Sequence, residues 1–131
     1  MAPTADELAR IPLFGSLSES QLDELAPSFE SRSVSPGTRL TGEGAAGYSF
    51  FVLADGAASV TVDGASVSAL AGGDCFGEVA ILDGGRRTAT VTATSPATVY
   101  VMFGTEFRRL QQSHPEIAAQ LEELMRKRVG A

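Results

Sequence analysis

The sequence predicts a small, mainly β domain with flanking helices (an α+β chain), built as a sandwich or a jelly-roll barrel. Short apolar segments with strand-like alternation fill the middle of the chain, and glycine and proline turns separate them. Apolar residues at helical spacing gather near both ends. With 131 residues, there is room for one hydrophobic core. We therefore expect one domain over residues 1–131, with N-terminal helices over 1–30, a β-barrel over 31–103 and C-terminal helices over 104–131.

Two short helices are expected near the N-terminus. Thr4 is followed three residues later by Glu7, and Ser18 by Gln21. A hydroxyl followed at this distance by Glu or Gln is the pattern of a capping box, which marks the start of a helix. After the second of these starts, apolar residues recur at helical spacing at Leu22, Leu25 and Phe29.

The middle of the chain contains several segments of strand-like composition. They lie at Tyr48–Leu53, Val60–Val62, Val67–Leu70, Thr88–Thr94 and Ala97–Phe103. The clearest turn signal is Asp63-Gly64, because this dipeptide favours the tight turn of a β-hairpin. Asp55-Gly56 and Ser95-Pro96 mark two further turns.

Helices are expected again after the last strand. Thr105 is placed to cap a short helix. His114-Pro115 is expected to open a longer one, because proline is well tolerated in the first turn of a helix. An apolar stripe then follows at Ile117, Leu121, Leu124 and Met125.

Composition excludes several classes of enzyme and metal protein. The chain has a single cysteine, Cys75, and a single histidine, His114. It therefore forms no internal disulfide, four-cysteine zinc site or two-histidine metal centre. Its one lysine, Lys127, is followed by arginine and not preceded by glycine, which excludes a Gly-Lys phosphate loop. We expect no catalytic residue, no metal ligand and no cofactor, and hence no enzyme.

The charge and the apolar pattern also limit the partners. The net charge is −6, whereas a domain that binds DNA normally carries a basic face. We therefore expect no nucleic acid binding by this chain alone. No apolar run approaches the roughly 20 residues that cross a bilayer, and the N-terminus lacks the features of a signal peptide. These features predict a cytoplasmic protein without a membrane partner.

One glycine-rich segment, residues 72–89, departs from the strand pattern. Gly77 allows the backbone to approach a ligand closely, and a short helical turn after it would favour an anion. Arg87 would supply a guanidinium to the same anion. Glu78 would be repelled by a phosphate, so its carboxylate must accept hydrogen bonds from a hydroxyl such as that of a ribose. An anion grip beside a hydroxyl acceptor indicates a nucleotide.

This segment resembles the phosphate-binding cassette of cyclic-nucleotide-binding domains. The likeness rests on Phe76-Gly77-Glu78-Val79-Ala80-Ile81-Leu82 followed by Arg87-Thr88-Ala89-Thr90-Val91. Members include bacterial catabolite activators, regulatory subunits of cAMP-dependent kinases and cyclic-nucleotide-gated channels. The segments Leu40–Gly44, Phe50–Gly56, Ile11–Phe14 and His114–Glu116 resemble other motifs of that family.

The resemblance implies a jelly-roll barrel, a lid helix at the C-terminus and a set of ligand contacts. Glu78 would bind the ribose 2′-hydroxyl, and backbone amides near Gly77 and Ala80 would bind the cyclic phosphate. Arg87 would be the charged partner of that phosphate, while Thr88 and Ala89 would line phosphate and base. The expected ligand-binding residues are Phe76, Gly77, Glu78, Val79, Ala80, Arg87, Thr88 and Ala89.

Three functions compete at this point. The first is a sensor of cAMP, and of cGMP as a second ligand, that signals by closing its last helix. The second is a barrel of the same fold that binds no nucleotide and acts as a protein-interaction domain. The third, a cupin-type enzyme, is disfavoured because one histidine cannot supply the usual metal ligands. No helix-turn-helix output domain is expected in this sequence, so the sensor would act through a protein partner, or the chain would be one piece of a longer polypeptide that supplies the missing effector domain. The last helix is also a candidate homodimer contact.

Overall fold

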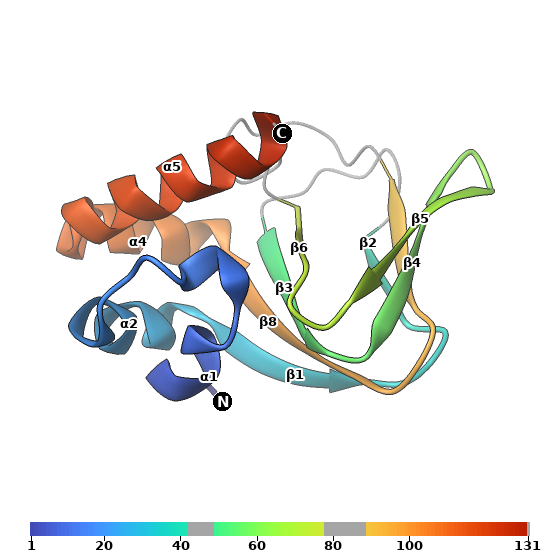
Figure 1. Cartoon of the computed structure of the whole chain (residues 1–131), viewed down its shortest axis with the longest axis horizontal. Coiled ribbons are helices and arrows are strands. Elements are labelled where there is room, and N and C mark those ends of the chain that lie inside the picture. The colour runs from blue at the N-terminus through green and yellow to red at the C-terminus, as the bar shows by residue number, and fades with distance from the viewer. Residues whose placement is uncertain (42–48, 78–88, 131) are drawn as a thin grey trace.

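The computed structural model describes residues 1–41, 49–77 and 89–130, and it is an all-antiparallel β fold with helices on one side (Figure 1). The α-helices are α1 (Ala5–Ala9), α2 (Glu19–Leu25), α4 (Gly104–Ser113) and α5 (Pro115–Gly130). Two 3₁₀ turns are η1 (Pro12–Phe14) and η2 (Ala26–Ser28). The strands are β1 (Glu30–Val34), β2 (Arg39–Thr41), β3 (Ser49–Asp55), β4 (Ala57–Val62), β5 (Ala65–Ala71), β6 (Cys75–Phe76), β7 (Thr90–Ala93) and β8 (Ala97–Phe103).

The strands form two four-stranded sheets that enclose a barrel. One sheet has the order β1-β8-β3-β6 and the other the order β2-β7-β4-β5. The Asp63-Gly64 hairpin predicted from the sequence is confirmed, and it joins β4 to β5. Both turn residues have positive φ, 52° for Asp63 and 78° for Gly64, as a tight hairpin turn with the right-handed twist requires.

The sheet β1-β8-β3-β6 is buried on both faces at its centre. In β3, Phe50 and Val52 belong to a core shared with the helices, whereas Phe51 and Leu53 belong to the core inside the barrel. Successive side chains of a strand point to opposite faces, so one strand serves two cores. This double burial is the reason why β3 and β8 appear in the sequence as continuous apolar runs without polar alternation.

Both predicted capping boxes are confirmed. The hydroxyls of Thr4 and Ser18 accept hydrogen bonds from the backbone amides of Glu7 and Gln21, at 3.1 and 3.2 Å. The backbone amide of Thr4 donates in return to the Glu7 carboxylate, and this bond is the main reason why the pKa of Glu7 is lowered. The other Glu7 carboxylate oxygen accepts a 3.5 Å bond from the Tyr100 hydroxyl, which ties α1 to β8. Burial, followed by this carboxylate, raises the pKa of Tyr100.

The C-terminal helices follow β8 directly. The prediction that Thr105 caps α4 is wrong: the N-cap is Phe103, and no side chain makes a capping bond there. The helix begins at Gly104, which is buried, because the chain turns straight from the strand into the helix. The prediction that His114-Pro115 opens a longer helix is confirmed by α5. Ile117, Leu121 and Met125 of α5 are buried in the core that the helices share with the sheet.

Candidate functional site

The two ends of the glycine-rich segment are held by different sheets. Phe76, the last residue of β6, pairs with Phe51 of β3, whereas Thr90 begins β7 in the other sheet. The Thr41 hydroxyl at the end of β2 donates a 3.3 Å hydrogen bond to the carbonyl oxygen of Ala89. Thr41 is a buried polar residue, so this bond satisfies it. Residues 78–88 therefore connect two fixed points on opposite walls of the barrel.

The entry to the segment is fixed by a tight turn against β3. The amide of Gly73 donates to the Leu53 carbonyl oxygen at 2.7 Å, and the Leu53 amide donates to the carbonyl oxygen of Asp74 at 2.8 Å. The Asp74 carboxylate accepts the amide of Ala71 at 2.9 Å. These bonds set the position from which β6 and Gly77 follow.

Gly77 has a φ of 88°, a backbone conformation that favours glycine over every other residue. It lies directly after β6 and directly before Glu78. A side chain here would strain the backbone at the point where the barrel wall gives way to the cassette. The backbone conformation at this position therefore explains why the motif has glycine here.

An aromatic pair lies beside Gly77 inside the barrel. The rings of Phe51 and Phe76 are parallel within 4°, with centroids 4.9 Å apart. They join an apolar interior that also contains Leu53, Val91 and Val101. The pair therefore belongs to the apolar core of the barrel at the point where the cassette leaves β6.

The structure places three of the eight predicted ligand-binding residues. Phe76 and Gly77 lie at the exit of β6, and Ala89 lies at the entry to β7, bonded to Thr41. The other five, Glu78, Val79, Ala80, Arg87 and Thr88, lie outside the described residues, as does the helical turn expected at Glu78–Leu82. Sequence reasoning missed Phe51 and Thr41, which hold the two ends of the cassette. Both lie in segments that resemble family motifs, Phe50–Gly56 and Leu40–Gly44, but those segments indicate no contact with the cassette, because the partners are distant in sequence.

The end of α5 reaches the turn that precedes the cassette. A cavity of about 460 Å³ lies between Lys127 of α5, Leu13 near the N-terminus and the turn residues Asp74 and Cys75. Figure 1 shows the C-terminal end of α5 above β6. The last helix is therefore close to the beginning of the glycine-rich segment.

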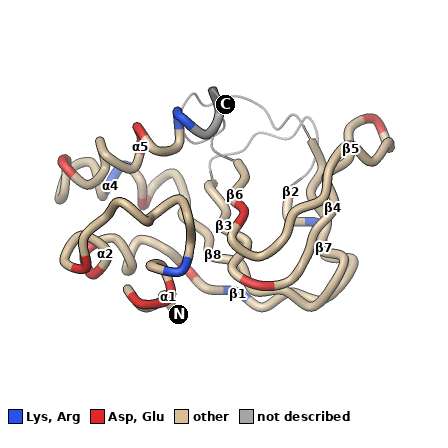
Figure 2. The backbone as a smooth tube through the Cα atoms, in the orientation of Figure 1, with Lys and Arg blue, Asp and Glu red and all other residues tan. Residues whose placement is uncertain are grey.

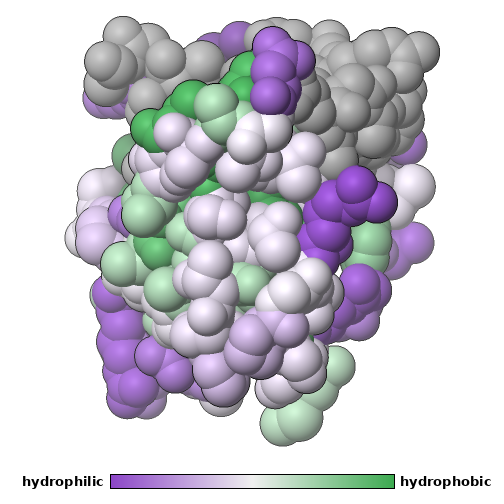
Figure 3. Space-filling view, turned by 90° about the vertical axis from the view of Figure 1, so that its right-hand side faces the viewer, coloured by the Kyte–Doolittle hydropathy of each residue, from purple (hydrophilic) through white to green (hydrophobic). Residues whose placement is uncertain are grey.

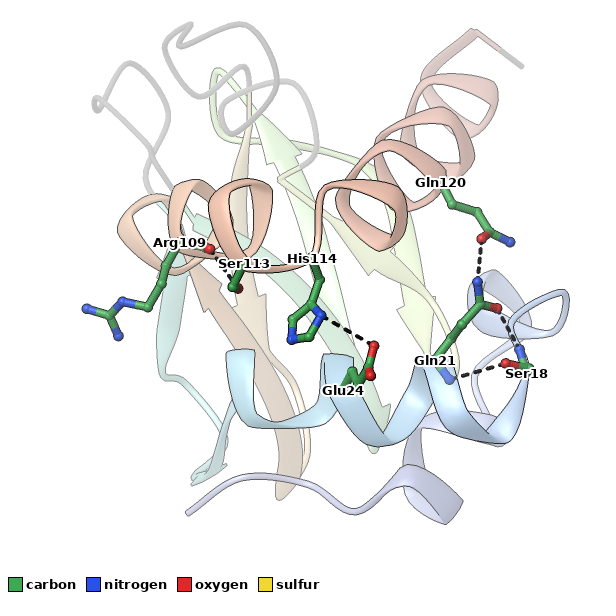
Figure 4. A network of polar contacts seen from close by, with 7 residues as sticks. All are labelled: Ser18, Gln21, Glu24, Arg109, Ser113, His114 and Gln120. Atoms are coloured by element: carbon green, nitrogen blue, oxygen red, sulfur yellow. Dashed lines mark hydrogen bonds and ion pairs between the residues drawn. The ribbon is translucent and has the colours of Figure 1, made fainter.

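The other end of α5 is attached to α2 by polar contacts (Figure 4). The Gln21 side-chain amide donates to the Gln120 side-chain oxygen at 2.9 Å. The Glu24 carboxylate lies 3.4 Å from Nδ1 of His114, at the junction of α4 and α5. These contacts fix the base of α5 on the N-terminal helices, so its two ends touch different parts of the domain.

A comparison with known families identifies this architecture. The model of the cyclic nucleotide-binding domain matches residues 31–114. The chain belongs to the cyclic nucleotide-binding domain family. The match includes both described ends of the cassette and the described strands apart from Glu30, the first residue of β1, and it confirms the family resemblance inferred from the sequence.

Individual relatives of this cyclic nucleotide-binding domain support the same family assignment. A cAMP-dependent protein kinase regulatory subunit of Yarrowia lipolytica is 39% identical over 105 residues, which are 79% of this chain and 28% of the relative. The chain thus spans less than a third of that protein. A solved structure of cAMP-bound PfPKA-R has a TM-score of 0.75 at 25% identity, over 94% of this chain and 45% of that one.

The N-terminal domain of a transcriptional regulator from Streptomyces coelicolor superimposes with a TM-score of 0.81 at 26% identity, over 95% of this chain and 90% of that one. These neighbours confirm the predicted jelly-roll barrel with flanking helices. In the described part of the domain, no helix combines the length and the apolar character needed to cross a bilayer. The same residues contain no cluster of three or more His, Cys, Asp or Glu side chains suited to a metal ion.

Proposed function

We propose that this domain is a cyclic nucleotide sensor whose working ligand is cAMP and which also binds cGMP. One observation carries the proposal: a chain of this family contains Gly77-Glu78 and Arg87-Thr88 at cassette spacing, between two anchored points of the barrel. The cAMP-dependent regulatory subunit among its relatives supports cAMP as the ligand. A sensor of this kind binds and reports, and it catalyses no reaction.

Each cassette residue has a proposed role. The Glu78 carboxylate accepts a hydrogen bond from the ribose 2′-hydroxyl. The backbone amides around Gly77 and Ala80 donate to the cyclic phosphate, and the guanidinium of Arg87 neutralises it. Thr88 and Ala89 line the phosphate and the base, while Phe76 and Val79 contribute apolar walls.

Titration of the purified chain with cAMP and with cGMP tests the proposal, because it separates the two leading functions. A sensor binds at least one nucleotide with saturation at one site per chain. A barrel that acts only as a protein-interaction domain binds neither. Isothermal calorimetry of the whole chain, with AMP as the control ligand, distinguishes them. Absence of saturable binding to both cyclic nucleotides would reject the sensor and favour the interaction domain.

Thr88→Ala is expected to reduce cGMP affinity more than cAMP affinity. A threonine after the cassette arginine can donate to the phosphate and also contact the guanine amino group, which adenine lacks. One neutral hydrogen bond contributes about 0.5–1.5 kcal/mol, so the change in preference is at most about tenfold. Paired titrations of both proteins measure it. Equal losses for the two nucleotides would mean that Thr88 touches the phosphate alone.

The last helix is proposed to report binding by closing over the base. We expect amide hydrogens from Ile117 to Val129 to exchange more slowly at saturating cAMP, because a lid must open easily when empty. The gain should be largest beyond Met125, since the earlier part of α5 is already packed on the N-terminal helices. Arg87→Ala at the same cAMP concentration is the control and should show no gain. Unchanged protection in the saturated wild type would leave a barrel that binds without this lid.

The signal also needs a receiver. We propose that a protein partner or an effector domain reads the position of α5, as kinase regulation by relatives of this domain suggests. A second copy of this chain, bound through the last helix in a homodimer, is one candidate for that partner. A cytoplasmic location and the lack of DNA binding by the isolated chain stay predictions of the sequence.

A further inference from the structure

In the described part of the chain, one edge strand of the barrel is long and carries neither a charge nor a proline. Among the residues described, the sheets end at β1, β6, β2 and β5. The β1 edge carries the ion pair between Glu30 and Arg32 at 2.8 Å, β6 has two residues, and β2 has three, one of them Arg39. Charges and short strands are the devices that keep edges apart. By contrast, β5 is seven residues long and contains neither a charge nor a proline; the feature that interrupts its regular pairing is a bulge at Val67.

The exposed part of β5 is also a palindrome. Residues 65–69 read Ala-Ser-Val-Ser-Ala in either direction, with Val67 at the centre. In an antiparallel pair of two such strands centred on Val67, Val67 faces its own copy, Ser66 faces Ser68, and Ala65 faces Ala69. Residues of the same kind thus lie opposite each other across the two-fold axis, so the side chains of each pair match in size and polarity. Ser–Ser pairs can exchange hydrogen bonds across strands, and the valines supply an apolar centre.

Val67 is the residue of β5 whose exposed apolar side chain such a pair would bury. Its exposed fraction is 59%, and apart from the N-terminal Met1 it is the one large hydrophobic residue that is exposed in the described structure. The register between β4 and β5 passes from Val60–Ser68 to Thr61–Ser66, so Val67 faces no residue of β4. This bulge leaves Val67 without a cross-strand neighbour inside its own chain.

Charge does not oppose the approach of two copies at this edge, although the chain carries −6 overall. Figure 2 shows β5 without a charged residue along its length, and Figure 3, which looks onto this side, shows near-neutral residues over the middle of the face with hydrophilic ones toward its rim. Asp63 lies in the turn before β5, outside the paired strand. The two Ala65 residues that begin the paired strands are roughly 13 Å or more apart, at about 3.4 Å per residue, so the two Asp63 residues lie beyond the range of unscreened repulsion.

We propose that β5 is a homodimer interface, in which two copies of this chain join their sheets by antiparallel pairing of β5 with its two-fold axis at Val67. The interface uses no residue of the last helix and none of the predicted ligand-binding residues, so we expect it to form with and without nucleotide. The joined sheet would run through β2-β7-β4-β5 of one copy and continue in reverse order through the other.

Sedimentation equilibrium of the full chain, from micromolar to millimolar concentration and with and without cAMP, tests the dimer. Val67→Lys places two ammonium groups face to face at the axis and is expected to raise the dimer dissociation constant by more than about tenfold. Ser33→Lys, at an exposed position of the β1 edge, is the matched control and should leave it unchanged. Thermal unfolding of both variants checks that the fold is intact.

Cysteine cross-linking tests the register. Residues directly opposite in an antiparallel pair have Cα atoms about 4.5–5.5 Å apart, within the range for a disulfide. Under mild oxidation, Val67→Cys should cross-link with itself, and a mixture of Ala65→Cys with Ala69→Cys should give the mixed dimer. Either of these two alone should not, since identical residues then lie roughly 13 Å or more apart. The native Cys75 is buried and remains in every variant.

The outcomes separate the possible interfaces. A dimer weakened by Val67→Lys, with the predicted cross-links, supports the proposal. A chain that stays monomeric up to millimolar concentration overturns it, and so does a dimer that is indifferent to Val67→Lys, which would point to the last helix. A dimer with cross-links in a different register overturns the two-fold axis at Val67.

Discussion

Replacing Arg87 with alanine is expected to weaken cAMP binding by roughly 30-fold to several thousand-fold. The guanidinium is the proposed partner of the cyclic phosphate, and truncating one member of a desolvated charge pair costs about 2–5 kcal/mol. Much of that cost arises because the remaining charge stays poorly paired. Calorimetric titration of the variant with cAMP measures the loss. Arg87→Lys keeps the charge but loses the planar fork of donors, so an intermediate affinity is expected.

The neighbouring arginine provides the matched control. Arg86 and Arg87 are adjacent, and successive residues of an extended chain point to opposite sides, so only one of them can face the ligand. Arg86→Ala is therefore expected to change affinity far less than Arg87→Ala. Equal losses for the two variants, or unchanged affinity for Arg87→Ala in a chain with normal thermal unfolding, would remove Arg87 from the proposed site.

Local features of the fold could be predicted from the sequence wherever the signal and its cause lie close together. Both capping boxes act over three residues, and both are present. The strand β8 has the predicted bounds Ala97–Phe103, since a β-branched and aromatic run is closed there by Pro96 on one side and Gly104 on the other. The tight turn at Asp63-Gly64 follows from residues that tolerate positive φ.

Features that depend on distant residues could not be predicted in this way. The two-residue strand β6 exists through its pairing with β3, some 25 positions earlier in the chain, and no local pattern marks it. The expected cap at Thr105 failed for a related reason, because packing of Gly104 at the end of β8 determines where α4 begins.

The candidate site also contains features that depend on nearby residues and features that depend on distant ones. The cassette residues could be proposed from the sequence because their spacing forms a motif in one segment. Phe51 and Thr41 hold the cassette ends through a ring stack and a hydrogen bond. Their segments resemble family motifs, but nothing local in those segments indicates a role at the cassette. Their role becomes visible once the two sheets are assembled, since it consists entirely of contacts with residues far along the chain.

Gly56→Ala is expected to destabilise the domain by roughly 2–5 kcal/mol, a large share of the stability of a domain of this size. Gly56 lies in the turn between β3 and β4 with a φ of 101°, where a side chain strains the backbone. A Cβ atom built there would lie 2.6 Å from the carbonyl oxygen of Pro96 and 2.7 Å from the Cβ of Ala97. Backbone atoms cannot move aside cheaply, because the amide of Ala57 donates to the Ser95 hydroxyl and the amide of Thr94 donates to the Ala57 carbonyl oxygen.

Gly64→Ala separates the two parts of this cost. Gly64 also has positive φ, 78°, but a Cβ atom there would meet nothing within 4 Å. Its replacement should cost only the backbone strain, about 1–2 kcal/mol. Urea unfolding of the two variants and the wild type measures the difference, which comes from the contact with the β7–β8 connection. If the free energy of unfolding falls equally in both variants, Gly56 is required for its backbone conformation alone. The close approach of the β3–β4 turn to the β7–β8 connection then contributes nothing to the cost of the substitution.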